Sequence, residues 1–586
     1  MLIVDLVVIP WGSECVVSMQ PQSWPEPDPQ VAAAIRAMYR GRREAPLAVQ
    51  VRDRLGELFP DAAFAGAFGQ VGKPGWSPGR LALVTVLQKS ANLTDRQAAD
   101  EVRENLAWKY ALGLGLEDPG FDHSVLSEFR SRVVAHGLEE RVLDLLLERL
   151  QTLDLVQAGG SQRTDSTHIV AAVRDLNRLE LVGESVRATL NALAAACPEW
   201  VDQVLVVEDW SHRYADRIDN WRLPASKTKQ HELALAYAAD GYTLLQALYA
   251  LASPGWLREL PAVQTLRCVL VQNYTRTADR AGRLRIRQRE RTGSGGDGLP
   301  PAPARLASPY DTDTRWSAKR DLFWNGYKLH VSETCHPQAD GDRPTRPNLI
   351  TNVTTTCSTL PDSKALDTIH QAFRHRHLLP ARHYLDSGYP SADLIVSSAK
   401  DYGIALVTPV LLDTSRQAKA QQGFAADDFT IDWDRKRAVC PTGKISATWN
   451  DVVQEGVAKT VVAFAALDCI PCPAKEQCTS SRKGRRLSLH PRELTETIRT
   501  ARAQQQDGTW QRDYALRAGV EGAIRQATHT TGLRRARYRG LAKTHLDHTT
   551  SATALNLIRL NAWWNGHPLD RTNHSHLARL QLRLAA

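Results

Sequence analysis

The stretch RDYALRAGVEGAIRQ, residues 512–526, decides how we interpret the rest of the chain. If it forms a helix, Tyr514, Arg517 and Glu521 fall at positions i, i+3 and i+7 on one face. A carboxylate, a guanidinium and a phenol presented together suit a metal ion beside a phosphate. The alternative is an exposed, solvated helix, and the two glycines within it each cost about 1 kcal/mol relative to alanine. The stretch therefore predicts an active-site helix only if other carboxylates join it.

The composition is that of a globular protein with a basic excess. The chain has 586 residues, of which 43% are hydrophobic and 23% charged, and this length predicts about three domains. A net charge of +9 favours a polyanionic partner. Nine cysteines, an odd number, occur without a secretory signal, so we expect reduced thiols or metal ligands rather than a disulfide framework.

The N-terminal run MLIVDLVVIPWGSECVVSMQ is apolar but short, and it contains Asp5. It lacks a basic start and cannot span a bilayer, although a signal peptide remains an alternative. We expect residues 1–29 to be a disordered or extra extension. With no other segment able to cross a membrane, we expect a cytoplasmic, nucleoid-associated protein.

Residues 30–155 show apolar spacing typical of helices, and Thr94-Asp-Arg-Gln97 has the form of a capping box. A glycine-rich turn separates this helix from a second one, Val125–Leu147, which carries Arg130 near its start. Two helices joined by a turn fit a helix-turn-helix reader of DNA. The alternative is a plain helical bundle with solvated charges. We predict a helical DNA-binding domain.

The next segments alternate between extended and helical patterns. Asp165 projects from a predicted strand at 160–170, and a helical insertion follows over 171–290. Residues 275–305 are rich in arginine and then in glycine and proline, a composition that predicts a mobile basic linker. After it we predict a strand, a strand, a helix, a strand ending at Asp386, a helix and a strand. The predicted ranges are Tyr327–Cys335, Leu349–Thr356, Ser363–His377, Arg382–Leu385, Ser391–Tyr402 and Ile404–Val410.

With the insertions removed, this order is that of the ribonuclease-H fold, in which the first and fourth strands are neighbours. Asp165 and Asp386 would then meet at one sheet edge, and the last helix would deliver Glu521. The predicted fold class is an α/β catalytic core, a ribonuclease-H-like mixed sheet with insertions, plus an all-α N-terminal domain. Its core would comprise 160–411 and 506–586, interrupted by a cysteine-containing insertion at 412–505.

Three converging carboxylates repel one another unless divalent cations neutralise them. Mg²⁺, or Mn²⁺, suits such an oxygen-rich site, and two ions can activate the attacking oxygen and stabilise the leaving one in a phosphoryl displacement. We therefore predict that Asp165, Asp386 and Glu521 bind metal. Asp311 and Asp313, or Asp362 in place of Asp386, are alternative acids.

Four motifs resemble the DDE transposases of bacterial insertion sequences, specifically the group numbered eleven-eighty-two. The resemblance covers the chain from about residue 25, and the motifs are TDSTHIVAAVRDLNRLELVGESVR (164–187), SPYDTDTRWSAKRDLFWNGYKLHVSETC (308–335), YLDSGYPSADL (384–394) and GLRRARYRGLAKTHLDHTTSATALNLIRL (532–560).

The resemblance implies that Asp165, Asp386 and Glu521 form the catalytic triad. Tyr514, Arg517 and Glu521 match a tyrosine-arginine-glutamate signature of related transposases, but its further tyrosine falls at Thr528, unless Tyr538 replaces it. The implied reaction cuts a phosphodiester at the element end and then joins the released 3′-OH to target DNA. Arg517 would hold the scissile phosphate, or simply pair with a neighbouring acid on its helix.

The insertion at 412–505 holds four cysteines. Cys469 and Cys472 have the two-residue spacing of a metal knuckle, while Cys478 follows after five residues, and Cys440 precedes a predicted turn. Four thiolates would make a closed structural Zn²⁺ site. The alternative is a set of buried, redox-idle thiols.

A basic cluster lies near the C-terminus, before a predicted closing helix at Ser551–Trp564. We expect it to contact phosphates, although a solvated charge run is the alternative. The predicted DNA-contacting residues are Arg534, Arg535, Arg537, Arg539 and Lys543, together with Arg130 and Lys328.

The sequence thus predicts a metal-dependent DNA transposase that binds element ends and target DNA and carries out cleavage and strand transfer. One alternative is a catalytically inactive DNA-binding protein, such as a repressor derived from a transposase. Another is a ribonuclease-H-like nuclease that cuts DNA without joining it. Because two ends must be held together, we expect at least a homodimer during the reaction.

Overall fold

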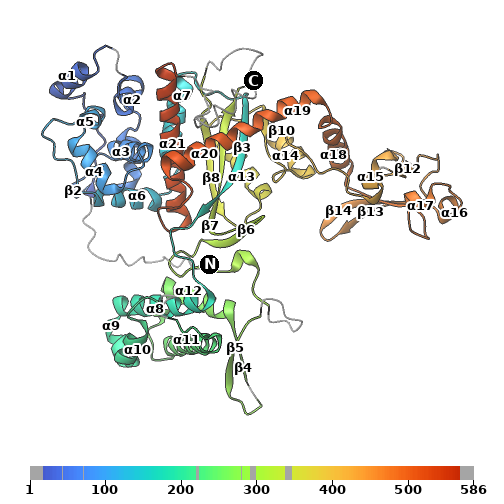
Figure 1. The fold of residues 1–586 in the computed structure, drawn as a ribbon, viewed down its shortest axis with the longest axis horizontal. Helices are drawn as coiled ribbons and strands as arrows, with labels where there is room; N and C mark the ends of the chain where they lie inside the picture. The colour runs from blue at the N-terminus through green and yellow to red at the C-terminus, as the bar shows by residue number, and fades with distance from the viewer. Residues whose placement is uncertain are drawn as a thin grey trace, which may run out of the picture.

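The structure, a computed structural model, describes residues 17–567 apart from 42–43, 70, 219–222, 279, 291–297, 337–345 and 421. A mixed sheet lies at the centre with helices packed around it, a helical module sits beneath the sheet, and a β-rich arm extends to one side (Figure 1). The predicted combination of a mixed α/β core with additional helices is confirmed at this level. Among the described residues, no helix is both long enough and apolar enough to cross a membrane.

The central sheet has six strands in the order β10-β9-β3-β7-β6, and β8 also pairs with β7. β3 is antiparallel to β7 and parallel to β9, while β9 is parallel to β10 and β7 is antiparallel to β8. The first and fourth predicted strands are therefore neighbours, as expected. β6 was not predicted. The bounds are β3 Ser161–Val170, β6 Arg315–Lys319, β7 Leu322–Cys335, β8 Ile350–Cys357, β9 Arg382–Tyr384 and β10 Ala405–Val407.

Both faces of the sheet are covered, and the side chains of β7 show how. Tyr327, Leu329 and Val331 belong to the large core that contains α20 and α21. His330, which alternates with them, faces the other side and lies 2.6 Å from the Tyr389 hydroxyl. α13 and α14 form a smaller core with the strand ends on that second side. The helices are α13 Asp362–His375, α14 Ala392–Tyr402, α20 Gly519–Thr531 and α21 Leu541–Trp564.

The N-terminal helices do not form a core of their own. Their apolar side chains join one continuous core with α21 and one face of the sheet. A buried ion pair between Lys89 and Asp547 ties α3 to α21. The helices are α1 Pro29–Met38, α2 Leu47–Leu55, α3 Pro78–Ser90, α4 Asp95–Glu104, α5 Leu106–Leu112, α6 Ser124–Ala135 and α7 Arg141–Thr152.

Three predictions for the N-terminal region can be compared directly with the structure. The capping box of Thr94 and Gln97 is confirmed at the start of α4. The single helix predicted over 125–147 is wrong, because the chain breaks at Gly137, whose φ of +65° ends α6. The extension predicted over 1–29 is ordered from residue 17: β1 (Val17–Ser18) pairs with β2 (Lys73–Pro74), and Trp24 is buried in the large core. Residues 1–16 lie outside the described part.

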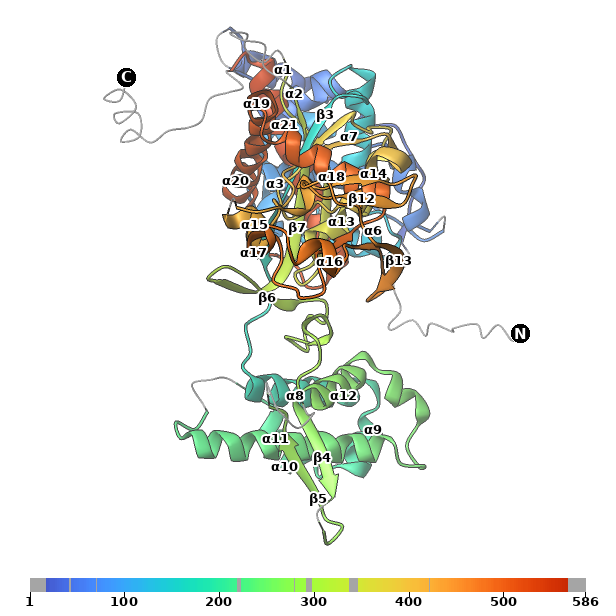
Figure 2. The same ribbon diagram turned by 90° about the vertical axis from the view of Figure 1, so that its right-hand side faces the viewer.

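The helical insertion predicted over 171–290 is a module with its own core. A capping box of Asn177 and Glu180 begins its first helix. The linker predicted from residue 275 is wrong over its first half, which forms a β-hairpin at the end of the module (Figure 2). The elements are α8 Arg178–Ala196, α9 Pro198–Val204, α10 Val207–Tyr214, α11 Lys227–Leu248, α12 Pro261–Asn273, β4 Tyr274–Ala278 and β5 Leu284–Gln288.

The cysteine-containing insertion forms the β-rich arm, with a small core of its own. α18 (Arg492–Gln504) and α19 (Gly508–Tyr514) lead back from it to the sheet (Figure 1). The arm comprises β11 Thr430–Asp432, β12 Arg437–Val439, β13 Thr448–Gln454, β14 Val457–Ala463, α16 Ala466–Cys469, α17 Lys475–Cys478 and β15 Arg486–Leu489.

Candidate active site

Asp165 and Asp386 come together because of strand pairing. β3 and β9 run parallel with Arg163 opposite Tyr384, so the same register continued by two residues sets Asp165 opposite Asp386. The Oδ1 of Asp165 accepts a hydrogen bond from the Ser166 N–H at 2.7 Å. Asp386 lies two residues after the end of β9, and its Oδ1 accepts from the Gly388 N–H at 2.9 Å. Both carboxylates are therefore held by backbone donors at one edge of the sheet.

Arg517 links Glu521 to this edge of the sheet by hydrogen bonds. The predicted continuous helix over 512–526 is divided: α19 ends at Tyr514, a 3₁₀ turn, η6 (Ala515–Ala518), follows, and α20 begins at Gly519. Arg517 donates from Nη1 to Asp165 Oδ2 at 3.2 Å and from Nη2 to Glu521 Oε1 at 2.6 Å. One guanidinium thus joins two acidic residues that are remote in the sequence.

Arg163 fixes the start of α20 against the sheet. Its Nη1 donates to the Leu516 carbonyl at 2.6 Å, and its Nη2 lies 2.7 Å from Glu333 Oε1 on β7. A Cβ at Gly519 would lie only 2.0 Å from the Arg163 guanidinium, which explains why this helix tolerates a glycine there. Sequence reasoning missed Arg163 and Glu333. The available signal was a basic residue in one predicted strand and an acidic residue in another.

We expect Gly519→Ala to destabilise the protein by about 1–3 kcal/mol, because Arg163 is buried and held by Glu333 and cannot easily move aside. Gly522→Ala is the matched control, since a Cβ there meets nothing within 4 Å. Urea denaturation midpoints of the two variants test this. Equal midpoints would show that Arg163 does not restrict the helix start.

The electrostatics of the site favour a cation. Burial raises the pKa of the Asp165 carboxyl above its usual value, and the nearby charge of Asp386 adds to the effect, against the Ser166 N–H and Arg517. In the part of the chain that the structure describes, no group of three or more His, Cys, Asp or Glu side chains is arranged to hold a metal ion. Arg517 lies between the acids and supplies the positive charge in this arrangement.

Asp362 lies next to the two aspartates but is already paired. Its Oδ1 accepts from Lys328 Nζ at 2.8 Å, and its Oδ2 accepts from the Ser166 hydroxyl at 2.8 Å. Burial pushes its pKa up, but the Lys328 ammonium outweighs this and leaves the pKa below its usual value. Asp362 is at the start of α13 and close to Asp386, because a Cβ built on Gly388 would approach oxygens of both. We infer that Asp362 and Lys328 support the site from the second face of the sheet.

The other alternative acids have structural roles elsewhere. Both carboxylate oxygens of Asp311 accept from the Tyr327 hydroxyl at 2.8 Å, and Asp313 accepts from the Leu541 N–H at 2.8 Å at the start of α21. Tyr538, the suggested substitute for a missing tyrosine, packs against the N-terminal helices under the Arg130 guanidinium, 4.8 Å from its ring centroid. Its phenol is therefore part of that interface and not of the carboxylate site.

Several predicted DNA-contacting residues instead form hydrogen bonds or ion pairs with other groups of the protein. Arg130 is 8% exposed and pairs with both oxygens of Asp95, so its placement does not fit a phosphate contact. Lys328 binds Asp362, as described above. Arg534 donates to the Thr167 hydroxyl at 2.6 Å, and Arg537 donates to the Leu93 carbonyl at 2.8 Å.

The other three predicted residues remain accessible to some degree. Arg535 and Arg539 are exposed, and Lys543 is half-buried with its Nζ 3.2 Å from the Ser131 hydroxyl. The predicted basic tail is in part the first two turns of α21, which begins earlier than expected at Leu541.

The four cysteines of the arm lie near one another, but among the described residues they do not form a group arranged to hold a metal ion. Cys440, Cys469, Cys472 and Cys478 line one small cavity of about 30 Å³. Burial raises the pKa of the Cys478 thiol, and the other three thiols add to the rise. The backbone N–H groups of Lys444 and Arg485 point at the sulfurs of Cys440 and Cys469, at 3.3 and 3.4 Å. Such donors are typical of sulfurs that carry negative charge.

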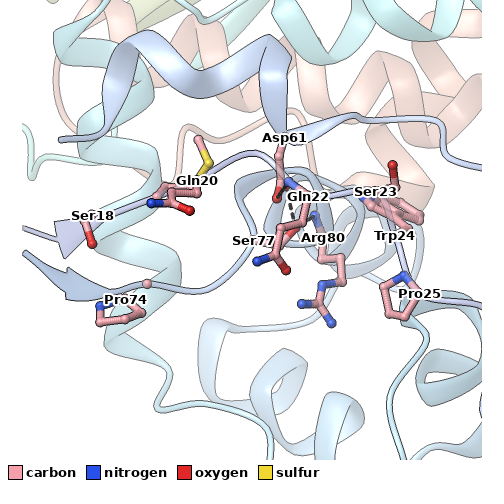
Figure 3. A pocket seen from close by; sticks show the side chains of 12 residues that line it. Ser18, Gln20, Gln22, Ser23, Trp24, Pro25, Asp61, Pro74, Ser77 and Arg80 are labelled. Atoms are coloured by element: carbon pink, nitrogen blue, oxygen red, sulfur yellow. Dashed lines mark hydrogen bonds between the residues drawn. The ribbon is translucent and has the colours of Figure 1, made fainter. Parts of the chain in front are cut away.

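A cavity of about 460 Å³ near the N-terminus is lined by none of these groups, and its lining residues are drawn in Figure 3. Asp61 on its wall accepts from the Ser77 hydroxyl at 2.5 Å and from the Gly79 N–H at 3.0 Å. These bonds fasten the start of α3, so the acid has a structural explanation. Burial lowers the pKa of Arg80, the cavity's other charged residue, and Asp61 opposes this change.

Comparison with known protein families gives two matches. Residues 439–561 match a family model described as "Transposase DDE domain", a range that includes Arg517, Glu521 and the four cysteines of the arm. Residues 41–132 match a family model described as "Transposase domain (DUF772)", which covers most of the N-terminal helices. No curated protein and no solved structure matches the chain.

Proposed function

The chain belongs to the DDE transposases of insertion sequences, and on that basis we propose that it binds the ends of a DNA element, cuts them in a metal-dependent reaction and transfers the released strand to target DNA. The observation that carries the proposal is the bridge of Arg517 between Asp165 and Glu521. These two hydrogen bonds link Asp165 on β3 to Glu521 on α20, a helix within the matched transposase domain. Asp386 lies opposite Asp165 in the continued register of β9.

The sheet supports a ribonuclease-H-like assignment of the core. Taken in chain order, β3, β7, β8, β9 and β10 stand in the spatial order third, second, first, fourth, fifth. Of these five strands, the second, β7, runs antiparallel to both of its neighbours β3 and β8, and the fourth and fifth run parallel to the first. The neighbouring positions of the first and fourth strands agree with the element order, and β6 is an additional strand beside β7.

The residues present fit a divalent cation by their chemistry. Carboxylate oxygens are the ligands that Mg²⁺ and Mn²⁺ prefer, and a buried Asp165 with a raised pKa gains most from a nearby positive charge. We propose that Asp165, Asp386 and Glu521 hold the metal, which would activate the attacking oxygen and stabilise the leaving one. Arg517 would then be released from the acids to bind the scissile phosphate.

Strand cleavage tests this function. Purified protein is incubated with a duplex carrying the element's own end, in Mg²⁺ or in EDTA, and products are followed for nicks and for joining to a second duplex. Metal-dependent nicks at the element end followed by joining support the transposase. Nicks without joining indicate a nuclease, and end binding without any cleavage indicates an inactive DNA-binding protein. A single protomer that completes cleavage at both ends would contradict the proposed homodimer.

We also propose that the four cysteines of the arm bind a structural Zn²⁺ ion. We expect elemental analysis of the purified protein to give about one zinc per chain. Cys472→Ser should lose the metal, while Cys268→Ser, on α12 of the helical module, should keep it. A folded wild-type protein free of zinc would contradict the proposal and would leave the four cysteines as thiols packed in or around the small core of the arm.

A further inference from the structure

The β4–β5 hairpin concentrates positive charge in the helical module. Residues 274–290 contain six arginines and two acidic residues, a net charge of +4. The helices before it, residues 171–273, contain ten basic and twelve acidic residues, a net charge of −2. The net positive charge of the module therefore lies on the hairpin, and the net charge of its helices is negative.

The pairing register sorts the hairpin into two faces. Thr275 lies opposite Arg287, and Thr277 lies opposite Arg285, so these four residues share one face. Arg285 and Arg287 are exposed. Ile286, on the other face, packs against the core of the module. The face with Tyr274 and Ile286 is thus directed at the module near the base of the hairpin, and the face with the two threonines, Arg285 and Arg287 is directed away from it.

The base of the hairpin is firmly attached. Tyr274 is buried, and its hydroxyl donates to the Ala234 carbonyl at 3.1 Å. The Arg289 N–H donates to the Asn273 carbonyl at 2.8 Å, and Arg178 donates to the Arg289 carbonyl at 2.9 Å. Arg276 stacks over Tyr242, 4.8 Å from its ring centroid. The ribbon therefore projects from the module in a defined direction, away from the central sheet (Figures 1 and 2).

We propose that the outward face of this hairpin is a second DNA-contacting surface, which binds duplex DNA at a distance from the carboxylates. The inference rests on the proposed function, since it takes the element DNA as the ligand. A two-stranded ribbon fits the major groove of B-form DNA, and arginine is suited to both phosphates and base edges. DNA fits this face better than an acidic protein, because threonine hydroxyls lie opposite the arginines and both groups donate to phosphate oxygens.

Equilibrium binding of a duplex carrying one element end, measured by fluorescence anisotropy over a salt series, tests the surface. We expect Arg285→Ala with Arg287→Ala to weaken binding about thirty-fold near about 0.15 M salt and to reduce the salt slope by about 1.8, the values for two lost phosphate contacts. Arg285→Lys with Arg287→Lys should restore most of that slope, because the charge is kept. Lys227→Ala with Lys229→Ala removes the same charge from exposed positions on α11 and should leave binding unchanged.

Cleavage of the same duplex by the wild type separates this inference from the function it rests on. If the wild type cuts in Mg²⁺ and the hairpin variant binds with unchanged affinity and slope, the second surface is wrong and the transposase stands. An equal loss of DNA affinity in the α11 control would show a general effect of net charge and would also contradict the proposed DNA-contacting role of the hairpin. If the wild type neither binds nor cuts element ends, both proposals fail.

Discussion

Asp386→Ala is expected to bind element-end DNA with the affinity of the wild type and to cut it at least about a thousand-fold more slowly. The side chain follows β9 and accepts only the Gly388 N–H, so its removal leaves no buried partner without a bond. Catalytic groups that act together lose most of their effect when one is removed, which sets the size of the loss. Single-turnover cleavage in Mg²⁺ measures it.

Asp393→Ala is the matched control for that experiment. Asp393 is also an aspartate in the segment after β9, but it lies in the first turn of α14, and the structure gives it no bond to the carboxylate site. The Asp393→Ala variant should cut the element-end DNA at the wild-type rate. A variant at position 386 that retains cleavage within tenfold of the wild type would remove Asp386 from the site and would make Asp362 the acid to test next.

Glu333→Ala is expected to lower the free energy of unfolding by about 3–5 kcal/mol. The Glu333 side chain is 1% exposed and pairs with Arg163 and with Arg559 of α21, each at 2.7 Å. Without it, two guanidinium groups remain in a buried setting without their carboxylate. Because Arg163 also holds the Leu516 carbonyl, we expect DNA cleavage to fall as the start of α20 loosens. Urea denaturation gives the stability change.

The control for Glu333 is an exposed pair. Arg492 and Glu496 are both about half exposed on α18, at 2.9 Å, and Glu496→Ala should change stability by no more than about 0.5 kcal/mol. Glu333→Gln keeps the shape and some of the hydrogen bonds, so it should fall between the two. A loss below about 1 kcal/mol for Glu333→Ala would show that water reaches the two arginines and replaces the carboxylate.

The order of elements was enough to predict the centre of the fold. Strand and helix patterns between 327 and 410 predicted the sheet segments closely, and the pairing of β3 with β9 followed from their order alone. The predicted strand ending at Asp386 and the observed β9 differ by one residue. These features depend on local periodicity and on few topological choices, which a single sequence contains.

What the sequence did not reveal depends on partners that are distant along the chain. Arg130 looks accessible on a helix, but Asp95 and Tyr538 bury it. The hairpin was not predicted because arginine occupies every second position over residues 283–289, a pattern that resembles a charged linker. Only the structure shows that Ile286 packs against the core of the helical module. The 3₁₀ turn η6 likewise contacts a distant partner, because its Leu516 carbonyl accepts from Arg163 on a strand far earlier in the chain.

The long helix α21 has a consequence for how the protein is made. It emerges last from the ribosome among the described elements, yet the N-terminal helices and one face of the sheet both need it to cover their apolar side chains. Synthesis that stops before Leu541 would leave that surface open on the N-terminal helices and on the sheet. A premature stop codon there should therefore yield an aggregating or degraded fragment and not a shortened, working enzyme.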